Sequence, residues 1–306
     1  MVDKKLGPAS GSVRVAADAQ IKLEVNYNGF SNLPFLDKLA DDDLTGLSFA
    51  NGSGGFEIAD KEFSRLSRCR RLQLLSIESS EAGNQAMQAI GKMPEMRRLS
   101  ISTTTIKPAD TAVLARLPNL LHLTMNHNDL SDESLRHIQN LNGLVSLEAK
   151  RCGLTAVGMK YLAKLTNLRD LKLSSNKIGN SGLAALPDLP GLELLSIDEC
   201  GLTPAGMAVI TKFPRLKILY SNWCEPTKEC LTHLVKLKSL KQLSISGYPC
   251  KLSDLAVLTS AKRLKKLTVT VSKADEEKAR ELLPNVEMKF VLNKSGIPLE
   301  IFAPLH

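Results

Sequence analysis

One spacing governs this sequence: the pattern L-x-x-L-x-L-x-x-N/C-x-L, with Met, Ala or Ile replacing some leucines, returns every 24 residues. It is fullest at 120–130, 144–154, 168–178 and 192–202. The same frame holds at Leu72, Met96, Leu216, Leu240 and Leu264, and extends to a longer, 28-residue unit at Leu44, to Gln20 and to a short unit at Val286. A fixed period of this size means stacked units with one continuous core, because no single unit can bury its apolar face alone.

Each unit opens with an alternation that predicts a short strand. Successive side chains of a strand point to opposite faces, so Leu171 and Leu173 face the core while Lys172 faces outward. The ninth position bends the chain away from the sheet and leaves backbone groups that need partners. Asparagine side chains supply them at Asn128 and Asn176. Cysteine fills the same position more weakly at Cys152, Cys200 and Cys224, and we interpret these thiols as structural.

The second half of each unit predicts a helix. Ser or Thr recurs at one equivalent position suited to a helix N-cap, at Ser131, Thr155, Thr203, Thr227 and Ser253. Apolar residues follow at helical spacing, as at Leu135, Ile138 and Leu141. Proline then ends the helix in several units, at Pro94, Pro118, Pro190 and Pro214. Stacked, these units give a parallel sheet that curves inward, because helices are wider than strands.

The repeated motif resembles the leucine-rich repeat superfamily over nearly the whole chain. The helix starts T-x-x-G-M and S-x-x-S-L resemble its ribonuclease-inhibitor-like subclass, in a 24-residue form frequent in bacterial repeat proteins. The resemblance implies an α/β solenoid, a right-handed horseshoe with a parallel concave sheet and convex helices. We expect a flexible leader at 1–19, an N-terminal cap strand and helix at 20–43, about ten repeats at 44–283, and a C-terminal cap and tail at 284–306.

The resemblance also implies a non-catalytic scaffold that binds a protein partner through the outward positions of its strands. Most of these positions carry small polar residues, which solvate a sheet and imply no ligand. Larger side chains gather in four or five neighbouring units, whose strands lie about 4.8 Å apart. We expect the partner to contact Glu148, Lys150, Arg151, Lys172, Asp198, Glu199, Tyr220 and Trp223.

Trp223 is the only tryptophan in 306 residues. By register it points outward on the same side as Tyr220, and exposed Trp, Tyr and Arg together are typical of interface hot spots. The alternative is that Trp223 folds over the rim of the sheet and packs against the turn at 225–227 or against Tyr248.

The charge distribution offers a competing hypothesis. The net charge is +8, and the excess lies in residues 207–306, which hold 17 basic and 9 acidic residues. Lysine occupies one place in three successive units, and the edge where the strands start carries Arg215, Lys217, Lys241, Arg263 and Lys265. Such an edge suits an anion, a nucleic acid or an acidic partner. The sequence interleaves no aromatic residues with these cations and has no nucleic-acid motif, which weighs against nucleic acid.

The sequence carries no motif that predicts catalysis, a cofactor or a metal site. His122 and His127 share a unit, but the strand between them separates them by about 16 Å. The cysteines lack metal-ligand spacing, and Cys230 at a helix start is the one we expect to be partly exposed and most reactive. Because no apolar run is long enough for a signal peptide or a membrane span, we expect a cytoplasmic protein, with a trimmed secreted chain as the alternative.

Overall fold

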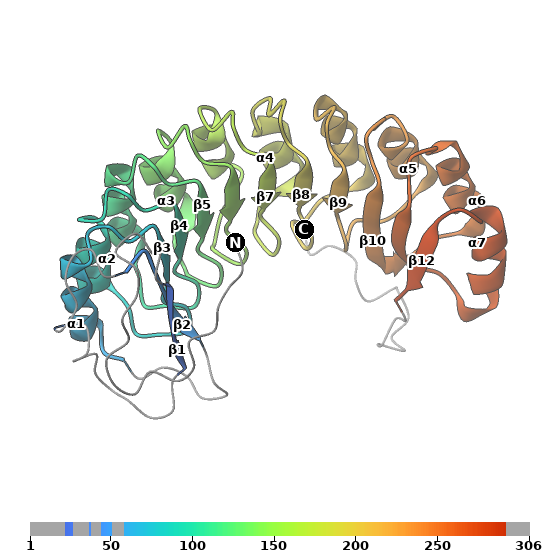
Figure 1. Cartoon of the computed structure of the whole chain (residues 1–306). Coiled ribbons are helices and arrows are strands. Elements are labelled where there is room, and N and C mark those ends of the chain that lie inside the picture. Colours follow the sequence, from blue (N-terminus) through green and yellow to red (C-terminus); the bar gives the residue numbers. More distant parts are fainter. Residues whose placement is uncertain (1–21, 27–36, 38–43, 51–57, 292–306) are drawn as a thin grey trace.

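The computed structural model describes residues 22–26, 37, 44–50 and 58–291, and these form an arch (Figure 1). Twelve parallel strands make one sheet in which spatial order follows sequence order. The strands are β1 (Lys22–Asn26), β2 (Gly46–Ala50), β3 (Leu74–Ser76), β4 (Arg98–Ser100), β5 (His122–Thr124), β6 (Ser146–Glu148), β7 (Asp170–Lys172), β8 (Leu194–Ser196), β9 (Ile218–Tyr220), β10 (Gln242–Pro249), β11 (Lys266–Thr270) and β12 (Glu287–Phe290).

Short helices connect the strands and form the outer layer of the arch, while the sheet lines its inner side (Figure 1). The α-helices are α1 (Asp60–Phe63), α2 (Asn84–Ile90), α3 (Ser131–Ile138), α4 (Gly179–Ala185), α5 (Lys228–Leu234), α6 (Leu252–Leu255) and α7 (Glu276–Leu282). The 3-10 helices are η2 (Ser64–Arg68), η3 (Pro108–Arg116), η4 (Gly158–Leu162), η5 (Pro204–Lys212), η6 (Ala256–Ser260) and η7 (Lys273–Asp275).

This architecture is the predicted α/β solenoid with a concave parallel sheet. The leader expected at 1–19, most of the cap expected at 20–43 and the tail from residue 292 onward lie outside the described residues.

The core lies between the sheet and the helices and follows the leucine frame. Leu171 and Leu173 are fully buried, while Lys172 between them lies on the concave side. Leu147, Leu171 and Leu195 pair in register on three neighbouring strands, so each leucine stacks on the same position of the next unit. The strand alternation predicted from the sequence is therefore confirmed.

Buried asparagines hold the chain where it leaves the sheet. Asn176 Oδ1 accepts hydrogen bonds from the backbone N–H groups of Cys152 and Leu154, both at 3.0 Å. Its Nδ2 donates to the carbonyls of Ala149 and Leu173, at 2.8 and 2.7 Å. Each such asparagine satisfies groups of its own unit and of the unit before it, as expected of this position.

Cysteine at the same position makes fewer bonds. Cys152 Sγ donates to the carbonyl of Met125 at 3.1 Å, and Cys200 Sγ to that of Leu173 at 3.3 Å. Burial raises the pKa of both thiols to about 11. These cysteines are therefore packing residues, as predicted.

The predicted N-caps are confirmed at Thr227 and only in part elsewhere. Thr227 caps its own helix, because its hydroxyl accepts from the N–H of Cys230 at 3.3 Å. The Thr155 hydroxyl accepts from the N–H of Val157 at 3.2 Å just before η4, whereas Thr203 precedes η5 without a side-chain cap. Both threonines are also bonded by a side chain from one unit back. Asp132 Oδ1 accepts from Thr155 N at 2.9 Å, and Asn180 Oδ1 accepts from Thr203 N at 3.0 Å.

Ser131 and Ser253 also depart from the prediction. Ser131 lies inside α3 with φ +54°, and Ser253 lies within α6, so neither precedes its helix.

The outer layer alternates between two conformations in the middle of the arch. The units with asparagine at the ninth position continue into the α-helices α3 and α4, and those with Cys152 or Cys200 continue into the 3-10 helices η4 and η5. Each of these units has a positive φ angle after its ninth position, and the place of that angle differs between the two conformations. It falls one residue after cysteine, at Gly153 (φ +70°) and Gly201 (φ +68°), and three residues after asparagine, at Ser131 and Gly179 (φ +54° and +60°). The structural repeat there is 48 residues.

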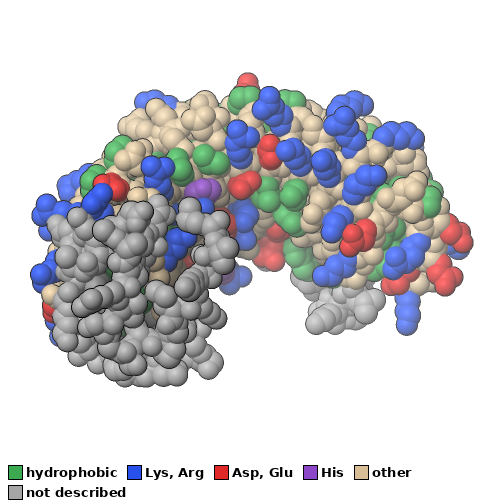
Figure 2. Space-filling view, viewed as in Figure 1, with side chains coloured by type: hydrophobic (Ala, Val, Ile, Leu, Met, Phe, Trp, Pro, Cys, Tyr) green, Lys and Arg blue, Asp and Glu red, His purple; other side chains and the backbone are tan. Residues whose placement is uncertain are grey.

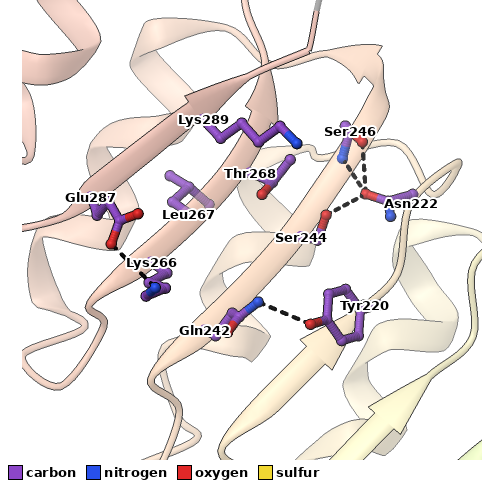
Figure 3. A pocket seen from close by; sticks show the side chains of 10 residues that line it. All are labelled: Tyr220, Asn222, Gln242, Ser244, Ser246, Lys266, Leu267, Thr268, Glu287 and Lys289. Carbon is purple, nitrogen blue, oxygen red and sulfur yellow. Dashed lines mark hydrogen bonds and ion pairs between the residues drawn. The ribbon is translucent and has the colours of Figure 1, made fainter. Parts of the chain in front are cut away.

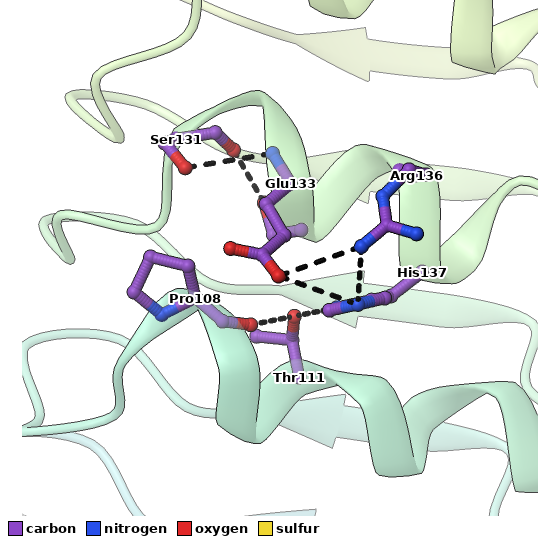
Figure 4. Close-up of polar contacts among 7 residues, drawn as sticks. Pro108, Thr111, Ser131, Glu133, Arg136 and His137 are labelled. Carbon is purple, nitrogen blue, oxygen red and sulfur yellow. Dashed lines mark hydrogen bonds and ion pairs between the residues drawn. The ribbon is translucent and has the colours of Figure 1, made fainter.

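Polar contacts also tie neighbouring helices together on the outer side (Figure 4). The Thr111 hydroxyl of η3 lies 2.9 Å from Nδ1 of His137 on α3. On the same helix, Glu133 lies 3.8 Å from His137 and 3.5 Å from Arg136. These groups join two units without converging on a cavity, which fits a structural role.

Candidate functional site

Two shallow hollows meet at Tyr220 on the concave face. The first hollow, of about 300 Å³, is lined by Lys150, Lys172, Leu194, Ser196, Asp198 and Tyr220. The second hollow, of about 440 Å³, lies between Tyr220 and the strands β10, β11 and β12 (Figure 3). The first hollow brings together four of the residues proposed from the sequence, because their strands are neighbours and their side chains share one face.

Lys172, which lines the first hollow, forms an ion pair with Glu148 beside it. The Lys172 ammonium donates to the Glu148 carboxylate on the adjacent strand, and Asn126 Nδ2 lies 3.4 Å from the same carboxylate. Burial works to raise the pKa of Glu148, but the hydrogen bond and charge of Lys172 outweigh it, so the pKa lies below its usual value. Glu148 is therefore ionised and half-buried, and Lys172 is partly neutralised.

Asp198, proposed as a partner contact, has its carboxylate engaged in hydrogen bonds within the sheet. Its Oδ1 accepts from the backbone N–H and the side-chain amide of Asn222, at 2.8 and 2.7 Å. Its Oδ2 accepts from the hydroxyls of Ser174 and Ser196, at 3.0 and 3.1 Å. The carboxylate thus serves as the acceptor for the backbone N–H of Asn222 in the next unit. It lines the first hollow and at the same time links neighbouring units of the sheet.

Arg151, Glu199 and Trp223 share a backbone conformation at the end of their strands. Their φ angles are +50°, +52° and +64°, and the equivalent residues of other units also have positive φ. The left-handed conformation is uncommon for residues with a side chain, and here the consecutive units from Leu72 to Leu240 adopt it to turn the chain out of the sheet. These side chains therefore stand on the rim of the concave face, outside the first hollow.

Trp223 combines the two arrangements considered for it, exposure to solvent and packing on the rim. Its side chain is 45% exposed, one of the most exposed large apolar groups among the described residues. Its ring meets that of Tyr248 edge to face, with centroids 6.1 Å apart, and lies against Gly247, where an added Cβ would come within 2.8 Å of it. The ring is packed on the rim along one side and open to solvent on the other.

The second hollow is polar and preorganised. Gln242 Nε2 donates to the Tyr220 hydroxyl at 2.9 Å, which fixes the ring between the two hollows (Figure 3). Asn222 Oδ1 accepts from the backbone N–H of Ser246 at 2.8 Å, repeating the arrangement seen at Asp198. At the far side, Lys266 pairs with Glu287 at 3.3 Å.

The sequence reasoning missed two apolar residues at the start of the neighbouring strands. Leu194 and Ile218 pair in register, are only half-buried and share the concave face with Tyr220. Leu194 lines the first hollow. The signal was present, because a leucine and an isoleucine stand where other units carry Arg98, His122 and Asp170, but this outward position was not compared across the units.

The basic edge proposed from the sequence consists of Arg215, Lys217, Lys241, Arg263 and Lys265. The backbone N–H of Lys241 donates to the carbonyl of Lys217 at 2.8 Å, and that of Lys265 to the carbonyl of Lys241 at 2.8 Å. The three lysines therefore stand side by side, each immediately before one of the consecutive strands β9, β10 and β11. Glu193 precedes them in the same register and pairs with Lys217 at 2.7 Å. Many Lys and Arg side chains cover the C-terminal half of the arch (Figure 2).

The comparisons with known proteins agree with this geometry. Residues 164–186 match a family model described as a leucine-rich repeat. The chain has the fold of a leucine-rich repeat solenoid. One similar solved structure is an internalin (inlF) from Listeria monocytogenes, with a TM-score of 0.56 and 21% identity, over 82% of this chain and 77% of that chain. No curated protein matches the sequence significantly.

The remaining chemistry of this solenoid is that of a packed interior. All six cysteines are free and buried, including Cys230, so its expected partial exposure is wrong. A hydrogen bond with Cys224, together with burial, raises the pKa of Cys230 far above its usual value, the opposite of an activated thiol. Among the described residues, no three His, Cys, Asp or Glu side chains form a group that could hold a metal, and no helix is long and apolar enough to cross a membrane.

Proposed function

We propose that this leucine-rich repeat solenoid is a non-catalytic scaffold that binds a protein partner on its concave face, centred on Tyr220. The observation that carries the proposal is the meeting of two hollows at one immobilised aromatic ring. Around it lie the proposed contacts Glu148, Lys150, Arg151, Lys172, Asp198, Glu199 and Trp223.

A rigid, partly apolar surface of this kind is suited to protein recognition. Tyr220 is hydrogen-bonded by Gln242 and flanked by the half-buried Leu194 and Ile218, so it is already ordered before a partner arrives. Anchors of this type carry most of the binding energy of an interface, because little side-chain entropy remains to be lost. Other outward positions of the sheet, such as Ser76, Ser100 and Thr124, are small and polar.

The polar groups of the site support binding more than catalysis. Asp198 accepts four hydrogen bonds, and Glu148 is paired with Lys172, so neither carboxylate is poised as a general base. Catalysis requires a nucleophile or base in reach of a bound group. The two carboxylates are instead engaged in contacts between neighbouring strands.

Selection from a random peptide library on the immobilised protein tests this proposal. We expect most selected peptides to bind Tyr220→Ala at least about tenfold more weakly than the wild type, as is typical when an aromatic anchor is truncated. A matched control is Val157→Ala on the outer side, where the side chain is 60% exposed, and it should leave binding unchanged. Peptides that tolerate Tyr220→Ala and compete with one another elsewhere would show that the concave site is misplaced.

A further inference from the structure

We infer that the partner presents an acidic segment with one apolar side chain, which anchors beside Tyr220 while its carboxylates cross to the basic edge. This inference rests on the proposed function, because it specifies the chemistry of the partner at the same surface. Four features of the described residues support it.

The anchor position is an apolar corner of the first hollow. Leu194 and Ile218 are paired on β8 and β9, and Tyr220 lies on the same face two residues after Ile218. Both aliphatic side chains are only half-buried, so a partner can remove further apolar surface from water. With a volume of about 300 Å³, the open hollow has room for a single large side chain.

The basic edge continues directly from this corner. Lys217 immediately precedes Ile218 in the chain, and Lys241 and Lys265 follow on the next two strands through backbone hydrogen bonds of 2.8 Å. Neighbouring strands lie about 4.8 Å apart, and an extended peptide advances about 3.3 Å per residue. A segment that crosses the strands therefore moves from β9 to β11 in about three residues.

The cations differ in whether the protein already neutralises them. Lys172 pairs with Glu148, Lys217 with Glu193, and Lys266 with Glu287. Within the described ranges, no carboxylate lies within 4.0 Å of the ammonium groups of Lys150, Lys241, Lys265 or Lys289. Lys150 lines the first hollow, Lys289 lines the second, and Lys241 and Lys265 immediately precede the strands β10 and β11. These four lysines are therefore the cations that carboxylates of a partner would meet.

A protein segment fits this surface better than a nucleic acid does. Single-stranded nucleic acid binds through a series of aromatic rings on which successive bases stack. Among the described residues that line the two hollows, Tyr220 supplies the one ring. Glu193 and Glu287 also border the edge and would repel a backbone with a charge at every nucleotide, whereas a peptide can place its carboxylates between them.

Four fluorescein-labelled probes test the inference by anisotropy with the full chain. The first is a peptide of ten glutamates around a central leucine. In the second peptide glutamine replaces the glutamates, in the third glycine replaces the leucine, and the fourth probe is a single-stranded DNA of matched length. We expect the glutamine peptide to bind at least about tenfold more weakly, since several charge pairs are lost together. The glycine peptide should also bind about tenfold more weakly, because the buried leucine contributes roughly 1.5 kcal/mol.

Variants of the protein show which residues contact the glutamates of the peptide and which contact its leucine. Lys241→Gln/Lys265→Gln should weaken binding of the glutamate–leucine peptide about fivefold, which corresponds to the loss of two exposed ion pairs of about 0.5 kcal/mol each. The matched control is Lys92→Gln/Arg97→Gln, which removes two exposed cations from neighbouring units in the N-terminal half and should leave binding of this peptide unchanged. Tyr220→Ala should abolish the difference in affinity between the leucine and glycine peptides.

Several outcomes would overturn the inference. Equal binding of the glutamine peptide removes the acidic requirement, and tighter binding of the DNA, released by salt, would assign the edge to nucleic acid. Library peptides that depend on Tyr220 but contain no excess of Asp and Glu would leave the proposed function standing and defeat this inference alone. Peptides that ignore Tyr220 would defeat the proposed function itself.

Discussion

At the scale of single residues, the asparagines at the ninth position do the most to fix the chain. Asn176 is 4% exposed and bonds four backbone groups from two units. We expect Asn176→Ala to lower the free energy of unfolding by about 3 kcal/mol, because buried N–H and C=O groups lose their partners without gaining water. Urea denaturation followed by circular dichroism measures the change.

The neighbouring units provide a graded control for this prediction. Asn176→Cys introduces the residue found at Cys152 and Cys200, where the thiol donates to a carbonyl of the preceding unit. This substitution should lower the free energy of unfolding by about half as much as Asn176→Ala. Asn167→Ala removes a single exposed bond to the Asn142 carbonyl and should change stability by less than about 0.5 kcal/mol. Equal effects of all three substitutions would contradict the role assigned to Asn176.

The asparagine and leucine positions could be predicted because each stands at a fixed place in the repeated motif. Asp198 and Trp223 could not be predicted fully. The hydrogen bonds of Asp198 come from Ser174, Ser196 and Asn222, and its role as an acceptor appears only when three strands are placed side by side. The rim position of Trp223 depends on its positive φ and on Gly247 of the next unit, which outward register alone does not indicate.

At the scale of the helices, the sequence indicated where each begins but not what caps it. A Thr before a helix normally predicts a cap. Thr203 makes no such cap, and Asn180 from one unit back instead bonds both the N–H and the hydroxyl of Thr203. This arrangement also explains the glycine three residues after the Thr, since a Cβ at Gly206 would lie 2.1 Å from Asn180 Oδ1. A contact between units therefore accounts for the glycine of the T-x-x-G motif here.

A double-mutant cycle tests this contact between units. Gly206→Ala should destabilise the protein by about 2 kcal/mol, because the new methyl displaces Asn180 from Thr203. In an Asn180→Ala background the same change should have little effect, since the clashing amide is gone, and the coupling should exceed about 1 kcal/mol. Gly201→Ala, where nothing lies within 4 Å but φ is +68°, measures the contribution of backbone strain alone. Additive effects at Asn180 and Gly206 would contradict the contact.

At the scale of the whole molecule, stacking order decides how the protein is held together. Strands pair only with the next strand in sequence, and the main contacts among helices also join neighbouring units. The sequence period predicted this arrangement, because a repeat that contacts only its neighbours needs no information from distant residues. It did not predict the 48-residue alternation of α and 3-10 helices, since every unit has similar helical spacing and the difference arises in the turn before the helix.

Such a chain should lose cooperativity when a central unit is weakened. Leu171 of β7 is fully buried and pairs with β6 and β8, so Leu171→Ala should destabilise its unit by about 3 kcal/mol. Because the units on either side contact each other only through it, we expect a broader urea transition with a lower m-value, and faster hydrogen exchange across β6–β8. Leu267→Ala in β11, near the C-terminal end of the sheet, removes a comparable side chain and should accelerate hydrogen exchange only in β10–β12. If both variants kept one equally steep transition with uniform exchange, the arch would unfold as a single cooperative body, and its stability would depend on coupling that extends beyond neighbouring units.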